Sequence, residues 1–145
     1  MKEICCISRK YHFTAGHRLY FKAASDEENF KIFGKCSNPK GHGHDYYLEV
    51  RVRGEINRIT GHITDRSSMD ETVDEILKEL DYKRLDKEIY YFTDTQPTGE
   101  NIIMYLWAKL TERLNGDVKV VYMRLWETDN NYFEYFEEGG FRYEN

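Results

Sequence analysis

Two histidines separated by one glycine are the residues of this sequence best suited to bind a metal. On an extended strand, His42 and His44 would point to the same side with their Cα atoms about 7 Å apart, so both rings can reach one ion. His17, in a second stretch with strand-like alternation, could supply a third nitrogen. Three imidazoles suit Zn²⁺ and leave its fourth position open to substrate or water, as in catalytic sites. The alternative is a set of hydrogen-bonded histidines at the edge of the core.

Cys36 lies six residues before His42 and has three interpretations. It could be a fourth ligand that closes a structural zinc site, or a separate thiolate that abstracts a proton beside the cation. It could also be an unreactive loop thiol. The spacing alone does not decide among them.

Glu127 is a carboxylate on an otherwise apolar strand face. Alternation over Val118–Glu127 places Val121 and Met123 on the same face as Glu127. A carboxylate that faces the core needs a partner. Its two oxygens suit a ligand with two parallel N–H groups, such as the guanidine-like edge of a heterocycle, whereas Arg124 or a helix N-terminus would be an internal partner.

Several strands would position these groups. The clearest runs from His42 to Arg53, where apolar and charged residues alternate and the two histidines begin the apolar face. Ile4–Leu19 is a second strand, with His17 among apolar neighbours. After a turn over residues 54–61, further strands are expected at His62–Asp65, Val118–Glu127 and Tyr132–Phe136.

Two amphipathic helices complete the expected elements. Ser68–Leu80 begins with capping-box spacing and continues with apolar residues three or four apart. The second helix begins near Thr98 and ends before Asn115. Tyr20–Pro39 is polar and is expected to be a long loop. The order β, β, β, α, α, β, β predicts an α+β fold, an antiparallel sheet with two helices on one face, in a single domain over residues 1–145.

Composition argues against several classes of protein. The 145 residues carry a net charge of −5, which speaks against a nucleic-acid partner. No apolar run approaches the ~20 residues of a membrane helix, so no membrane partner is expected. The chain has three cysteines and no signal-peptide pattern at its start, which favours a reducing cytoplasm.

Basic residues are concentrated near the N-terminus. Residues 1–40 carry eight lysines and arginines against four acidic residues. This local excess could steer a phosphorylated small molecule to the N-terminal third of the chain. A solvated charged face explains the same pattern.

Taken together, the motifs resemble the family of 6-pyruvoyl-tetrahydropterin synthases and their relatives, which include the 6-carboxy-tetrahydropterin synthases. The resemblance covers most of the chain and is closer to the pyruvoyl branch. It is carried by Phe13–Leu19, Cys36–His44, the hairpin at residues 54–61, Leu80-Asp81 with Leu85-Asp86, Pro97–Asn101 and Trp126–Asn131.

The resemblance implies an architecture and a metal. The family has a T-fold, in which four antiparallel strands and two helices form a subunit, three subunits close a barrel, and two trimers form a homohexamer. It also implies that His17, His42 and His44 bind Zn²⁺.

The resemblance further implies roles for individual residues. Cys36 would be the catalytic thiol, Glu127 would anchor the pterin ring, and Thr98 and Glu100 would belong to the substrate-binding motif. In the family, a histidine usually follows the aspartate of the Leu-Asp motif and shares proton handling with that aspartate and the cysteine.

The chain departs from the family pattern at this histidine, because Tyr82 follows Asp81. A tyrosine has a pKa near 10, so it can donate a proton but is a poor base at neutral pH. Asp81 and Tyr82 are therefore expected to be catalytic residues of an altered set.

The implied activity is that of a zinc-dependent lyase that eliminates triphosphate from 7,8-dihydroneopterin triphosphate. One alternative is a 6-carboxy-tetrahydropterin synthase or side-chain-cleaving relative that acts on the same pterin triphosphate. Another is a pterin- or zinc-binding paralogue without turnover, which the replacement by Tyr82 favours. A structural zinc protein with Cys36 as fourth ligand would unfold when the metal is chelated.

Overall fold

The computed structural model describes residues 2–137. Its elements, in chain order, are β1 (Ile4–His17), α1 (Asp26–Phe33), the 3₁₀ helix η1 (Gly34–Ser37), β2 (His42–Glu55), α2 (Arg66–Lys78), β3 (Lys83–Arg84), α3 (Leu85–Glu88), the 3₁₀ helix η2 (Tyr90–Thr93), α4 (Gly99–Arg113), β4 (Val118–Thr128) and β5 (Asn131–Phe136). No helix in this part of the chain combines the length and apolarity needed to cross a bilayer.

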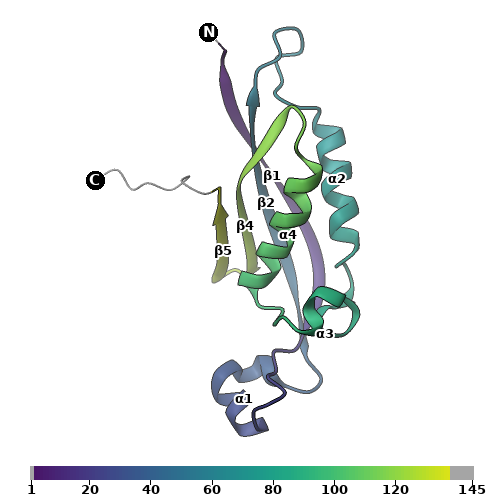
Figure 1. Ribbon diagram of the computed structural model, residues 1–145, viewed down its shortest axis with the longest axis vertical. Coiled ribbons are helices and arrows are strands. Elements are labelled where there is room, and N and C mark those ends of the chain that lie inside the picture. Colours follow the sequence, from purple (N-terminus) through teal and green to yellow (C-terminus); the bar gives the residue numbers. More distant parts are fainter. Residues whose placement is uncertain (1, 138–145) are drawn as a thin grey trace, which may run out of the picture.

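The long strands form one antiparallel sheet. β1 pairs with β2, β2 with β4 and β4 with β5, and the two-residue β3 joins the outer edge of β1 in parallel. α2 and α4 pack against each other and cover one face of the sheet (Figure 1). The predicted α+β fold, with four long antiparallel strands and two helices on one face, is confirmed, and β3 is an addition to it.

The core lies between the sheet and the two helices, and the sequence patterns explain it. Every second residue of β2 from Tyr46 to Val52 is fully buried. The ring of Tyr46 stacks on Phe13 of β1, with ring centroids 4.9 Å apart. α2 and α4 supply apolar stripes that include Val73 and Leu106. Burying each such side chain stabilises the fold by roughly 1.5–3 kcal/mol before the entropy cost of folding.

One residue of β4, Val121, has no partner on β2, because Val120 and Tyr122 pair with consecutive residues of that strand. The extra residue changes which side chains face the core. Val120 before it and Met123 after it are both buried, whereas Val121 is partly exposed. The predicted face that joined Val121 to Met123 and Glu127 is therefore wrong for Val121.

The beginning of α2 also differs from the prediction. Residues 62–65 are not a strand, and Asp65 is the N-cap of the helix, with its side chain accepting hydrogen bonds from the backbone N–H groups of Ser67 and Ser68. The helix therefore begins before Ser68, because an aspartate side chain satisfies the free N–H groups of the first turn. The predicted start of the other helix is confirmed, since Thr98 caps α4.

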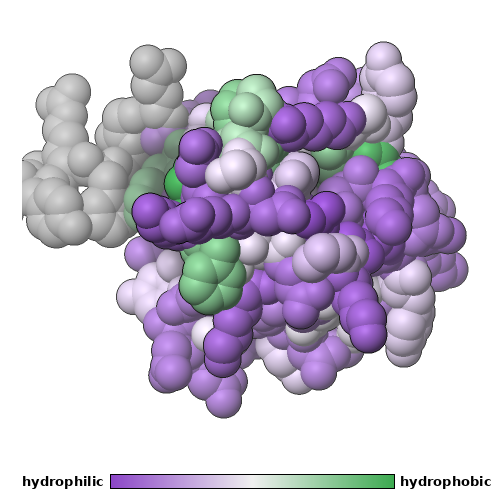
Figure 2. Space-filling view, turned by 90° about the horizontal axis from the view of Figure 1, so that it is seen from below, coloured by the Kyte–Doolittle hydropathy of each residue, from purple (hydrophilic) through white to green (hydrophobic). Residues whose placement is uncertain are grey.

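Residues 20–39 are not the single loop that the sequence predicted, because they contain α1 and η1. Ser25 caps α1 by accepting a hydrogen bond from the N–H of Glu28, and the acidic first turn suits a helix N-terminus. The buried Asn29 side chain then bonds both the N–H and the C=O of Phe21. α1 projects beyond the end of the sheet (Figure 1), and the molecule is largely hydrophilic when viewed from that end (Figure 2).

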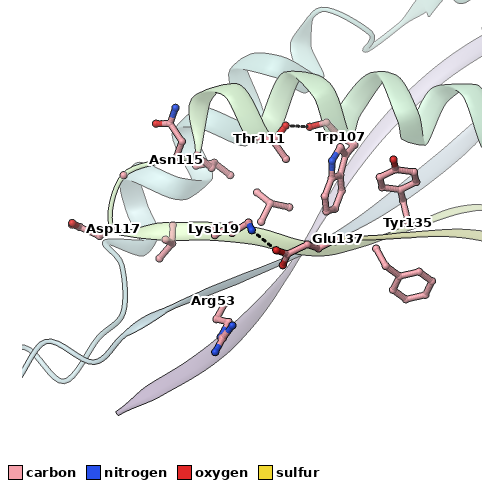
Figure 3. Close-up of a pocket in the computed structure, with 13 residues that line it drawn as sticks. Arg53, Trp107, Thr111, Asn115, Asp117, Lys119, Tyr135 and Glu137 are labelled. Atoms are coloured by element: carbon pink, nitrogen blue, oxygen red, sulfur yellow. Dashed lines mark hydrogen bonds and ion pairs between the residues drawn. The ribbon is translucent and has the colours of Figure 1, made fainter. Parts of the chain in front are cut away.

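A cavity of about 680 Å³ lies between the end of α4 and the strands β4 and β5 (Figure 3). Trp107 and Tyr135 line it, and Lys119 forms an ion pair with Glu137 at its edge. The cavity lies at the end of β2 opposite to His42 and His44, and its lining includes no histidine or cysteine among the described residues. It is separate from the site described next.

Candidate active site

The three histidines predicted as metal ligands meet at one end of the sheet. His17 ends β1 and pairs directly with His42 at the start of β2. Their ring centroids are 5.0 Å apart, and the ring of His44 lies 5.2 Å from that of His17 and 4.7 Å from that of His42. The strand pairing therefore produces the convergence that the His-Gly-His spacing predicted.

A backbone carbonyl fixes the orientation of His17. Nδ1 of His17 lies 2.7 Å from the carbonyl oxygen of Pro97, just before α4. A carbonyl can only accept, so Nδ1 carries the hydrogen and Nε2 keeps a free lone pair in the neutral ring. Burial lowers the pKa of His17 to about 4, which keeps the ring neutral at physiological pH.

The donor atoms form two overlapping sets that share His17, one with Cys36 and His42 and the other with His44 and Glu127. Nε2 of His17 lies 3.1 Å from Nε2 of His42, and burial also lowers the pKa values of His42 and His44. Nε2 of His44 is buried without a hydrogen-bond partner among the described residues. Neutral imidazole nitrogens gathered in this way are the donor set that Zn²⁺ prefers, and a buried nitrogen without a partner is otherwise costly.

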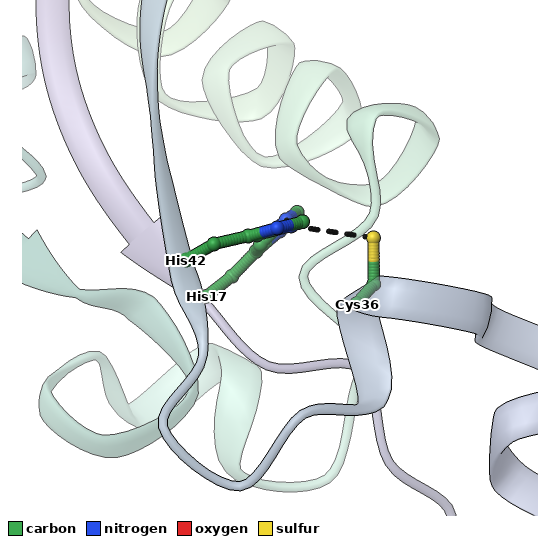
Figure 4. A group of neighbouring side chains, drawn as sticks. All are labelled: His17, Cys36 and His42. Atoms are coloured by element: carbon green, nitrogen blue, oxygen red, sulfur yellow. Dashed lines mark hydrogen bonds between the residues drawn. The ribbon is translucent and has the colours of Figure 1, made fainter.

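Cys36 reaches the same cluster from η1. Its Sγ lies 3.3 Å from Nε2 of His42, and Figure 4 shows the thiol directed at the two rings. Burial and the negative charge of Glu127 raise the pKa of the Cys36 thiol. The geometry allows Cys36 to be a ligand, since His17, Cys36 and His42 all offer donor atoms within 4.8 Å of one another. It equally allows a thiol that acts beside the metal.

Glu127 approaches the histidines from β4. One of its oxygens lies within 4.8 Å of donor nitrogens of His17 and His44. Burial raises the pKa of Glu127 and the nearby Glu100 adds to this, whereas His42 in its protonated form would lower the pKa of Glu127. Glu127 therefore lies on the face of the sheet where the sequence placed it, at the edge of the cluster, where it can meet a ligand.

The beginning of α4 borders this region. Thr98 is the N-cap, and its hydroxyl accepts a hydrogen bond from the N–H of Asn101. Glu100 is in the first turn, exposed, and close enough to Glu127 to raise its pKa. Gly99 between them packs so tightly on Phe133 of β5 that a Cβ at this position would lie 1.9 Å from the ring. Position 99 therefore requires a glycine for α4 to pack against β5 beside the site.

Asp81 and Tyr82 lie away from the cluster within one chain. The carboxylate of Asp81 accepts a hydrogen bond from the N–H of Thr14, at the outer edge of β1. Thr14 is three residues from His17, or about 10 Å along the strand. Tyr82 is 82% exposed and has a positive φ of 58°. Neither residue contacts Cys36 within residues 2–137.

Comparisons with known proteins agree with these features. A family model described as 6-pyruvoyl tetrahydropterin synthase matches residues 6–138. The chain belongs to this family. The family member named 6-pyruvoyl tetrahydrobiopterin synthase from Pongo abelii is 47% identical over 131 residues, which cover 89% of each chain.

The family's fold and branch also agree with the prediction. A solved structure of Caenorhabditis elegans 6-pyruvoyl tetrahydropterin synthase matches with a TM-score of 0.87 and 33% identity, covering 93% of this chain and 96% of that one. The 6-carboxy-5,6,7,8-tetrahydropterin synthase of Aquifex aeolicus is more distant, at 26% identity over 160 residues, covering 91% of this chain and 98% of that one. The predicted family, and its closeness to the pyruvoyl branch, are confirmed.

Sequence reasoning missed two groups beside the family's histidines. The Pro97 carbonyl is 80 residues from His17 in the chain, and no local pattern could have paired them. Tyr46 packs edge-on against His44, and its hydroxyl is buried without a hydrogen-bond partner among the described residues. The alternation of the strand did place Tyr46 on the same face as His44, but it gave no sign that the two rings are in contact.

Proposed function

We propose that the protein is a zinc-dependent lyase of the 6-pyruvoyl-tetrahydropterin synthase type, which converts 7,8-dihydroneopterin triphosphate into 6-pyruvoyl-tetrahydropterin and triphosphate. The observation that carries the proposal is the group of three neutral imidazoles with a thiol 3.3 Å from one of them. The names of the relatives agree with it.

In this proposal His17, His42 and His44 hold Zn²⁺, and Cys36 and Glu127 remain free to act. Bound Zn²⁺ would serve as a Lewis acid for the hydroxyl groups of the substrate side chain. The three rings carry no charge at neutral pH, because burial lowers their pKa values.

The chain's own residues then divide the remaining work. Cys36 would take a proton from a side-chain carbon, and a positive charge at the histidines would favour the thiolate that burial alone disfavours. The carbon–oxygen bond to the triphosphate breaks, and its electron pair leaves with the triphosphate. Glu127 would accept hydrogen bonds from the pterin ring, and Thr98 and Glu100 at the start of α4 would border it.

Assembly of several subunits would bring Asp81 and Tyr82 of one subunit to the Cys36 site of another. Asp81 and Tyr82 lie at the outer edge of β1, so they could reach Cys36 only in another subunit. We propose a homohexamer of two trimers, about 104 kDa, or six times the 17.4 kDa chain. Light scattering on the purified protein should give this mass, and a 17.4 kDa monomer would contradict the assembly. The exposed thiols of Cys5 and Cys6 fit a reducing, cytoplasmic location.

A second candidate function is favoured by Tyr82. Without the family's histidine, the protein could release a different product from the same substrate, either a 6-carboxy pterin or a pterin with a shortened side chain. It could also bind the pterin or zinc without turnover.

Triphosphate release, followed by phosphorus NMR, tests the proposal. Zinc-loaded protein should release triphosphate from 7,8-dihydroneopterin triphosphate, and chelation should stop the release until zinc is restored. His17→Ala should be inactive, whereas His62→Ala, an exposed histidine far along the chain from the cluster, should retain activity. Release that is indifferent to chelation, or equally lost in both variants, would contradict a zinc-dependent lyase.

A further inference from the structure

A second cavity opens beside His42, between the end of β1, α1 and η1. It has a volume of about 560 Å³, within the usual range for small-molecule sites. Arg18, Lys35 and His42 are among its lining residues. Because His42 also belongs to the histidine cluster, a group bound in this cavity would lie next to the proposed metal.

Two contacts hold the Arg18 guanidinium in place and leave its two terminal Nη groups free to donate hydrogen bonds. Its Nε donates to the carbonyl oxygen of Ser37 at 2.9 Å, and its guanidinium carbon lies 3.9 Å from the centre of the Tyr20 ring. The two Nη groups have no hydrogen-bond partner among residues 2–137. A guanidinium that is oriented but not paired is well suited to bind a phosphate through two parallel hydrogen bonds.

Lys35 supplies a second cation in the same cavity. It precedes Cys36 in η1, its side chain is exposed, and its ammonium group forms no ion pair or hydrogen bond among the described residues. The acidic lining residue, Asp26, already accepts a hydrogen bond from the hydroxyl of Tyr20. The cavity therefore presents two unpaired positive charges against one negative charge.

We propose that this cavity binds the polyphosphate end of the substrate, with Arg18 as a bidentate ligand and Lys35 as a point charge. The inference rests on the proposed function for the identity of the substrate. The ring would lie at Glu127 and the side chain would cross the histidines, so that the phosphates reach the far side of His42. Arg18 and Lys35 line the cavity, whereas Lys40 does not, so Lys40 is not part of the proposed phosphate site.

Binding of inorganic tripolyphosphate to the zinc-loaded protein tests the cavity without any turnover. Lys35→Ala should weaken binding at least about tenfold, because a charge-assisted contact is lost. Lys31→Ala is the matched control, since Lys31 is an exposed lysine of α1 outside the cavity that pairs with Glu27. Zinc chelation by the probe affects all variants alike, so the difference between Lys35→Ala and Lys31→Ala reports the cavity.

Two results would overturn the inference. One is equal binding by wild type, Lys31→Ala and Lys35→Ala, and the other is no binding by the wild type. Neither depends on whether pterins are converted, so the cavity and the proposed function can fail separately.

A variant of Arg18 distinguishes the contribution of its charge to phosphate binding from that of its two parallel hydrogen bonds. Arg18→Lys keeps the charge but loses the fork, and should weaken tripolyphosphate binding severalfold. In turnover, Lys35→Ala should raise KM about tenfold or more with a much smaller change in kcat, and the effect should shrink at high salt. A fall in kcat at unchanged KM would instead assign Lys35 to the chemical step and contradict its role as a phosphate ligand.

Discussion

At the scale of single residues, the geometry of Cys36 allows two roles, a metal ligand or a reacting thiol, and experiment can distinguish them. Its thiol lies 3.3 Å from Nε2 of His42, and His42 also lines the cavity that Arg18 and Lys35 border. His44 offers a buried nitrogen without a hydrogen-bond partner among the described residues, and in the proposed function this nitrogen binds the metal in place of the sulfur. The proposed division of work thus makes Cys36 a reacting group rather than a ligand.

Replacing Cys36 by alanine should therefore abolish turnover and leave the metal. We expect a loss of about 10²–10⁴-fold in kcat, the usual contribution of a proton-transfer group. Zinc content, measured by mass spectrometry, should stay at the wild-type level. Cys5→Ala, which removes an exposed thiol from β1, is the control and should be neutral. Loss of zinc from Cys36→Ala would make the thiol a ligand.

Tyr82→His should raise kcat if the tyrosine limits proton transfer. The side chain is exposed, so the imidazole can be introduced without disturbing the core. A histidine titrates near neutral pH, whereas a tyrosine does not. Steady-state rates at pH 7 measure the effect, with Tyr90→His, at another exposed tyrosine, as control. An unchanged or lower rate would show that Tyr82 already suits the reaction.

The meeting of the three histidines was predictable because their positions follow strand periodicity. The spacing of His42 and His44 fixed their common side, and alternation placed His17 among apolar neighbours. The orientation of each ring was not predictable, since it depends on the distant Pro97 carbonyl. The separation of Asp81 from Cys36 was also hidden, because it follows from the hydrogen bond between Asp81 and Thr14.

At the scale of elements, the cap of α2 offers a test of helix formation. Asp65→Ala removes the side chain that accepts from two backbone N–H groups and should lower the free energy of unfolding by about 1 kcal/mol. Urea denaturation measures the change. Ser68→Ala, at the position the sequence favoured, should change it by much less, and equal effects would contradict Asp65 as the cap.

An ion pair joins α2 to β1 and makes stability depend on pH. Arg9 donates two hydrogen bonds to Asp70 and Tyr11 donates a third, each at 2.7 Å. The hydrogen bond from Arg9 is the main cause that lowers the pKa of Asp70. A carboxyl group whose pKa is lower in the folded state stabilises the fold above its unfolded pKa, and this contribution is lost as the pH falls through the folded value.

Asp70→Asn should therefore destabilise the protein by about 1 kcal/mol at pH 7, and the difference from wild type should shrink below about pH 4. Urea denaturation at pH 7 and pH 3 measures both values. Asp74→Asn, at an exposed position of the same helix, should show neither effect. A difference that stays constant with pH would exclude the ion pair as its cause.

Elements were predictable where a regular pattern extends over many residues, and not elsewhere. β2 and α4 have such patterns and were placed to within a few residues. α1 has only eight residues, and it depends on the side chain of Asn29 bonding back to Phe21. The irregularity at Val121 depends on pairing with β2, which a single strand does not reveal.

At the scale of the whole molecule, the fold brings one part of the proposed active site together and leaves another at its edge. The histidines, Cys36 and Glu127 meet within one chain, whereas Asp81 lies at the outer edge of the sheet. The outer edges of β3 and β5 end the sheet, and such edges are natural places for further strands to pair. The proposed hexamer, which sequence patterns within one chain do not specify, would use these edges to complete each site.

The products formed from 7,8-dihydroneopterin triphosphate test the central claim most directly. The zinc-loaded protein should be incubated with this substrate, and the pterins identified by mass spectrometry beside a Cys36→Ala control. Our account predicts 6-pyruvoyl-tetrahydropterin with the wild type and unchanged substrate with the variant. A 6-carboxy or truncated pterin, or substrate left intact by the wild type, would contradict it and point to Tyr82 as the residue that changed the reaction.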